Sequence, residues 1–132
     1  MYAFKGIQDA ITVDGTAYFL LDNGRTLTMR FKLTVKKLRR KEQKDFVQPL
    51  IDLKKETGER DVLELNEDYE EYRDQVFRDV IVDWDLVDAN DERVEFSQNA
   101  LEAILDYREY RDAFWECIEK VQRGYDGLKR KN

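Results

Sequence analysis

The chain has 132 residues, of which 42% are hydrophobic and 39% are charged, and its formal net charge is −6 at pH 7. This length is sufficient for one domain with its own core, and the charged fraction, well above the usual quarter, indicates a densely ionic surface. The absence of histidine removes the commonest general base near neutral pH and the commonest metal ligand, so we expect neither an enzyme nor a bound cofactor or metal. No apolar run approaches the length of a membrane span, and the first residues lack the order of a signal peptide, so we expect a cytoplasmic protein.

Residues 7–33 have the composition of a three-stranded antiparallel meander. Their β-branched and aromatic residues are interrupted by Asp14-Gly15 and by Asn23-Gly24, dipeptides that favour two-residue hairpin turns. Apolar and polar residues alternate over 27–33, so one face of this strand is apolar. We expect helices to cover that face.

Three helical patterns follow the predicted sheet. In the first, residues 36–56, Pro49 predicts a kink or two shorter helices that meet near Gln48. The second begins at Asn66, whose side chain is a suitable cap before a run of acidic residues. The third begins at Ser97, and its apolar residues recur by steps of three and four over 100–125, which predicts a long helix packed lengthwise on another helix, in the same chain or in another copy.

These elements predict a single α+β domain over residues 1–132, with an N-terminal three-stranded antiparallel sheet packed by helices and a long C-terminal helix. The predicted parts are a β meander over 1–35, a helical part over 36–123 and a flexible basic tail over 124–132. The helical part contains a Trp-bearing connector at 80–97, in which we expect Trp84 and Phe96 to set how two helices meet.

The connector contains an acidic turn that resembles a calcium loop. Asp88, Asn90 and Glu92 alternate as ligands do in such loops, but the required Gly and Glu positions hold Arg93 and Asn99. We therefore interpret the segment as a solvated turn whose Asp and Asn side chains bond their own backbone.

Three further patterns favour structural interpretations. Asp83 and Asp85 could form a carboxylate pair, but no histidine, lysine or metal set adjoins them. The single cysteine, Cys117, is interpreted as a small buried hydrophobe rather than a nucleophile. The basic run over 36–44 is interpreted as a solvated helix face or a docking surface for an acidic partner, because no nucleic-acid-reading motif accompanies it.

Aromatic residues are the candidates for partner binding. Trp84 is either a core anchor or an interface hot spot, since tryptophan suits both roles. Tyr107, Tyr110, Phe114 and Trp115 exceed what one helical face can bury, because Tyr110 and Trp115 are expected to point away from the apolar seam. Such an excess on a charged helix predicts a partner surface.

The connector also has a distinctive order of residues. An apolar helix end is followed by Val82-Asp83-Trp84-Asp85-Leu86-Val87-Asp88, a turn, Val94-Glu95-Phe96-Ser97, and a helix with Leu101, Ile104 and Leu105. Upstream, the strand Met29-Arg30-Phe31-Lys32-Leu33 leads into the basic segment Lys37-Leu38-Arg39-Arg40. This order, over about residues 27–121, resembles the tail assembly chaperones of long-tailed bacteriophages.

The resemblance implies a small non-enzymatic protein of the host bacterial cytoplasm that coats the tape-measure protein during tail assembly and keeps it soluble. It also implies release as the tail-tube protein polymerises, absence from the finished virion, and no catalytic residues. Blocks of opposite charge and the apolar seam further predict a homo-oligomer, with neither nucleic acid nor membrane as a partner. The alternatives are a virion structural component, such as a tail completion or adaptor protein, and a carboxylate-based hydrolase.

Overall fold

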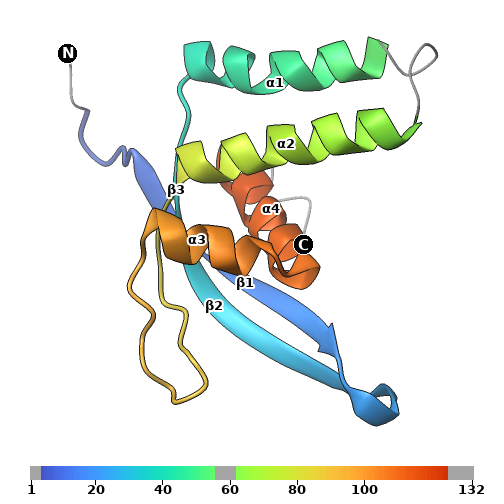
Figure 1. The fold of residues 1–132 in the computed structure, drawn as a ribbon. Coiled ribbons are helices and arrows are strands. Elements are labelled where there is room, and N and C mark those ends of the chain that lie inside the picture. Colours follow the sequence, from blue (N-terminus) through green and yellow to red (C-terminus); the bar gives the residue numbers. More distant parts are fainter. Residues whose placement is uncertain (1–3, 56–61, 125–132) are drawn as a thin grey trace. The chain divides into compact units, whose positions relative to one another are not determined.

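The computed structural model, drawn in Figure 1, describes residues 4–55 and 62–124. Its elements are β1 (Ala10–Leu20), a short 3₁₀ turn (Asp22–Gly24), β2 (Thr26–Lys36), α1 (Arg40–Lys55), α2 (Val62–Val80), β3 (Ile81–Trp84), α3 (Gln98–Leu105) and α4 (Arg108–Arg123). The strands form one antiparallel sheet in the order β1-β2-β3. The predicted α+β class with a three-stranded antiparallel sheet is confirmed.

The third strand is not where the sequence predicted it. β1 and β2 pair without interruption from Ala10 opposite Lys36 to Leu20 opposite Thr26, and they form the long curved hairpin of Figure 1. β3, from the Trp-bearing connector, pairs with the opposite side of β2 near the end of that strand. A meander of three strands within residues 7–33 is therefore wrong, because this segment makes two longer strands.

The Asp14-Gly15 dipeptide lies inside β1 and makes no turn. A Cβ atom on Gly15 would lie 2.4 Å from Cζ of Phe31 and 2.7 Å from Sγ of Cys117, so glycine is needed there for close packing. A turn at Asn23-Gly24 is confirmed, although it is part of a three-residue 3₁₀ turn, Asp22–Gly24, rather than a two-residue turn, and both residues have the positive φ that they tolerate, 69° and 74°.

One face of the hairpin is apolar and packs against α4. Phe31, Leu33 and Val35 are buried on this face, and alternate residues such as Lys32 are exposed on the other. The side of α4 in the core consists of Ala113, Phe114, Cys117, Ile118 and Val121, residues with the three- and four-residue spacing of one helical face. The core of this part of the chain lies between the sheet and α4.

The C-terminal helical stretch is divided. Ser97 begins α3 as predicted, because its Oγ accepts a hydrogen bond from the Ala100 amide at 3.0 Å. The helix then ends at Leu105, Tyr107 takes an extended conformation (φ −93°, ψ 114°), and α4 starts at Arg108. The 3.5-residue spacing over 100–125 thus belongs to two helices, and Tyr125 lies outside the described residues.

Two predictions about the middle helices are also corrected. α1 runs through Pro49 as one helix, so of the two outcomes predicted for this proline, a kink or a division near Gln48, the division into two shorter helices is wrong. α2 begins at Val62, four residues before Asn66, which is therefore not the N-terminal cap. Residues 62–65 are Val-Leu-Glu-Leu, and the leucine and glutamate among them propagate a helix readily, so a good capping residue does not by itself fix the start.

The described residues form two compact units. One contains residues 4–37 and 80–124, with the sheet, α3 and α4, and the other contains the described part of residues 38–79. Within the second unit, the Arg73 guanidinium lies 5.8 Å from the ring centroids of both Tyr69 and Phe77, and it pairs with Glu70 at 3.2 Å. None of the described helices is long and apolar enough to cross a lipid bilayer. The predicted basic tail falls almost entirely on residues 125–132, outside the described part.

Candidate functional site

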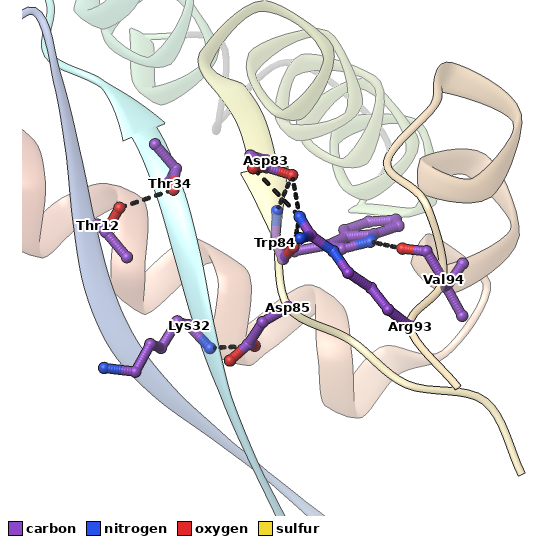
Figure 2. Close-up of polar contacts among 8 residues, drawn as sticks. All are labelled: Thr12, Lys32, Thr34, Asp83, Trp84, Asp85, Arg93 and Val94. Carbon is purple, nitrogen blue, oxygen red and sulfur yellow. Dashed lines mark hydrogen bonds and ion pairs between the residues drawn. The ribbon is translucent and has the colours of Figure 1, made fainter. Parts of the chain in front are cut away.

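Trp84 lies at the centre of the connector and is buried, with 3% of its surface exposed. Its indole Nε1 donates a hydrogen bond of 2.7 Å to the Val94 carbonyl, as Figure 2 shows, so the connector folds back over the ring. The ring centroid lies 5.0 Å from that of Phe96 in an edge-to-face arrangement and 6.2 Å from that of Phe114. In this conformation Trp84 is a core anchor, the first of the two roles that its residue type suits.

Asp83 and Asp85 do not form a pair. Asp85 Oδ1 accepts a hydrogen bond of 2.7 Å from the Lys32 amide, and the Asp85 amide donates to the Lys32 carbonyl at 3.2 Å, which extends the pairing of β3 with β2 (Figure 2). Asp83 Oδ1 instead accepts from Arg93 Nη2 at 3.1 Å, and Arg93 Nη2 also donates to the Trp84 carbonyl at 3.0 Å. The two carboxylates thus accept hydrogen bonds from different parts of the chain, Asp85 from β2 and Asp83 from the connector. They do not converge on one point at which a substrate atom could react.

The acidic turn is held by its own backbone. Asp88 Oδ1 accepts hydrogen bonds from the Asn90 amide at 2.8 Å and the Glu92 amide at 3.1 Å, which confirms, for the Asp88 side chain, the interpretation as a self-bonded turn. Asp91 completes the turn in the left-handed conformation, with φ of 60°, without a glycine. Within residues 4–55 and 62–124, no group of three or more Cys, Asp and Glu side chains is placed to hold a metal ion.

The aromatic residues predicted to bind a partner are split between core and surface. Phe114 is fully buried, and Tyr110 lies on the same packed side of α4, with ring centroids 5.3 Å from Phe19 and 6.0 Å from Phe31. The expectation that Tyr110 points away from the apolar seam is therefore wrong. Trp115 is half-buried, and Tyr107, 57% exposed, is the most accessible of the five predicted residues.

The Tyr110 phenol and the Cys117 thiol both lie on the packed side of α4. Desolvation raises the pKa of the Tyr110 phenol above its ordinary value of 10.0. Cys117 is buried beneath Gly15, as predicted for a small hydrophobe, and its Sγ lies 3.8 Å from the Asp14 carbonyl oxygen.

The structure reveals an apolar surface that the sequence reasoning missed. We call residues 18–27, where β1 turns into β2, the hairpin tip. Its exposed large hydrophobic residues are Tyr18, Leu20, Leu21 and Leu27. The sequence contains a signal of this apolar surface, because residues 15–21 form the longest uncharged run in a chain that is 39% charged.

Comparisons with protein-family models, with curated proteins and with solved structures gave no significant match to this chain.

Proposed function

We propose that the protein is a non-enzymatic tail assembly chaperone of a long-tailed bacteriophage, which binds and solubilises the tape-measure protein in the host cytoplasm. The tail-tube protein is a further candidate partner, and the chaperone acts as a homo-oligomer. The starting point of the proposal is the resemblance in the order of connector residues.

The observation that carries the proposal is the contact between Trp84 and Phe96. These two residues belong to the two halves of the resembling segment, they lie twelve residues apart in sequence, and their ring centroids are 5.0 Å apart. Ser97, which follows Phe96 in the same pattern, caps α3. Three of the residues that carry the resemblance, Trp84, Phe96 and Ser97, therefore attach the connector to the core and start α3, which supports the proposal.

A client surface is the second requirement for such a chaperone. Tyr107 is exposed and Trp115 is half-exposed on the C-terminal helical stretch, and aromatic residues are enriched at the centres of protein interfaces. The high charge of the remaining surface favours solubility of a complex with an aggregation-prone helical protein.

The proposal is tested by co-expression with the tape-measure protein encoded in the same genome. We expect the client to move into the soluble fraction and to copurify with the chaperone. Tyr107→Ser should reduce the recovered client, whereas Val87→Ser, which also removes an exposed apolar side chain but lies in the connector, should not.

Unchanged client solubility with the wild-type chain would contradict the proposal. Detection of the protein in purified particles by mass spectrometry would contradict it as well and would favour a tail completion or adaptor protein.

A further inference from the structure

The outer edge of β1 is open for strand pairing at the hairpin tip. The Leu21 amide donates to the Arg25 carbonyl and the Lys37 amide to the Asp9 carbonyl, both at 2.7 Å, so the odd-numbered residues of β1 face β2. In an antiparallel ladder the amide and carbonyl of one residue point to the same side, and this side alternates along the strand. The backbone groups of the even-numbered residues 16–20 therefore point away from the sheet.

Side chains of α4 cover this edge at its other end. The Asp14 carbonyl, which also points outward, lies 3.3 Å from Lys120 Nζ and 3.8 Å from Cys117 Sγ. Beyond Asp14, no described strand pairs with the outer side of β1. Figure 1 shows the hairpin tip extending away from α3 and α4.

The open edge lacks the features that usually prevent strand pairing. Natural edge strands carry charged residues, proline or bulges. Residues 15–21 read Gly-Thr-Ala-Tyr-Phe-Leu-Leu, and their ladder with β2 has no bulge. Tyr18 and Leu20 are 62% and 79% exposed beside the unpaired backbone groups. The neighbouring edge of β2, in contrast, carries the exposed Arg30.

We propose that the β1 edge pairs with the β1 edge of a second copy, antiparallel and centred on Tyr18. Two copies with a net charge of −6 each repel one another, and this edge lies in the longest run that contributes no charge to the repulsion. Centring on Tyr18 places the two Tyr18 residues opposite each other and Thr16 opposite Leu20 of the second copy. The exposed side chains of Tyr18 and Leu20 therefore both gain cross-strand neighbours.

The pairing also has a natural limit. The pairing ends where the chain turns at residue 22. Asp14 of one copy and Asp22 of the other, which this register would place opposite each other, therefore do not have to pair. The alternative contact between copies, the predicted apolar seam, is not accessible, because Phe114 and Ile118 are fully buried in their own chain. The β1 contact locates the self-association that is part of the proposed function and does not depend on the client.

Sedimentation of matched variants tests the β1 contact. We expect a reversible dimer of the wild-type chain at micromolar concentrations. Tyr18→Lys should raise the dimer dissociation constant by about tenfold or more, because it places two like charges directly opposite each other. Thr28→Lys adds the same charge to the same face of the hairpin, opposite Tyr18 on β2, and should leave the constant within about threefold. A wild-type monomer at about 100 μM, or equal weakening by both variants, would overturn the proposal.

A disulfide trap tests the register. Two copies of residue 18 in a hydrogen-bonded antiparallel pair have Cα atoms about 5.5 Å apart, a separation that a disulfide spans. In a Cys117→Ala background, Tyr18→Cys should form a covalent dimer on mild oxidation and Thr28→Cys should remain monomeric; the reverse result would overturn the register. Circular dichroism of each variant verifies that the fold is kept, and client solubility is measured separately, so failure of one proposal is distinguishable from failure of the other.

Discussion

Gly15 and Phe31 face each other directly across the β1–β2 ladder, and the Phe31 ring occupies the space in which a Gly15 side chain would stand. A Cβ atom at residue 15 would lie 2.4 Å from Phe31 Cζ and 2.7 Å from Cys117 Sγ. Phe31 in turn contacts Phe114 of α4, with ring centroids 5.2 Å apart. The missing side chain therefore sets how closely α4 approaches the sheet.

Gly15→Ala should lower the free energy of unfolding by about 1–3 kcal/mol, because the added methyl group overpacks a filled core. Urea denaturation followed by circular dichroism measures the loss. Phe31→Leu removes the ring atoms that the methyl group would meet, so the cost of Gly15→Ala should be smaller in that background. Strict additivity of the two substitutions would contradict the steric explanation.

Features that depend on local chemistry were predictable from the sequence. The Ser97 cap, the Asn23-Gly24 turn and the self-bonded acidic turn each involve residues close together in the chain. The pairing partners of the strands could not be predicted in this way, because strand pairing depends on packing between residues that are distant in the sequence. Asp14-Gly15 has the composition of a turn, and only the Phe31 ring and Cys117, far away in sequence, show why it lies within a strand.

The error at Tyr110 has a different origin. Tyr110 precedes Phe114 by four residues, and residues four apart lie on the same face of a helix, so its place on the packed side of α4 was predictable from the spacing. The break at Asp106 and Tyr107, in contrast, was not predicted, and it divides the apolar seam between α3 and α4. The two open roles of Trp84 could not be separated by sequence, because its hydrogen bond to the Val94 carbonyl is made across a fold of the connector.

Trp84→Phe should lower the free energy of unfolding by about 1–3 kcal/mol, through the lost hydrogen bond to the Val94 carbonyl and the smaller ring in a buried position. Trp115→Phe, at the other tryptophan, is the control and should cost less, because Trp115 is only half-buried. Chemical denaturation of both variants provides the comparison. Equal losses would show that the connector is not anchored mainly through Trp84.

Asp91 occupies a left-handed conformation that glycine adopts without steric cost. Asp91→Gly should therefore keep the turn and leave stability unchanged or raised by up to about 1 kcal/mol. Asp91→Val should lower it by about 1–2 kcal/mol, because a β-branched residue is strained at this φ. Asp91→Asn removes the charge but tolerates the conformation, so it separates backbone strain from electrostatics. Thermal unfolding measures all three, and a loss with Asn as large as with Val would rule out backbone strain as the cause.

Tyr110 should make the protein less stable at alkaline pH. Because burial raises the pKa of its phenol above 10.0, the unfolded chain loses this proton before the folded protein does. The stabilising contribution is complete below pH 10.0 and is lost as the pH rises through the raised pKa. Tyr110→Phe should therefore show a smaller fall in unfolding free energy above pH 10.0 than the wild-type chain.

The control for this pH effect is Tyr107→Phe, which makes the same substitution at an exposed tyrosine of the same helical stretch. Burial, together with the charge of Tyr69, raises the pKa of Tyr72 to about 12, so Tyr72 contributes a decline that also begins near pH 10.0 and continues to about pH 12, and this decline is present in the wild-type and the Tyr110→Phe proteins alike. Parallel declines for the wild-type and Tyr110→Phe proteins between pH 10 and the raised value would contradict the assignment to Tyr110.

Residues 38–79 should be replaceable without loss of the sheet unit. Their described part forms a compact unit of its own, and in sequence they lie between β2 and β3, in which Val35 is opposite Ile81. A hairpin loop of about 2–5 residues is enough to join such a pair. Both tryptophans, Trp84 and Trp115, lie in the sheet unit, so fluorescence of the shortened chain reports on this unit alone. We expect the blue-shifted emission of a buried tryptophan and a cooperative unfolding transition, and exposed-type emission without a transition would show that the sheet unit needs the insertion to fold.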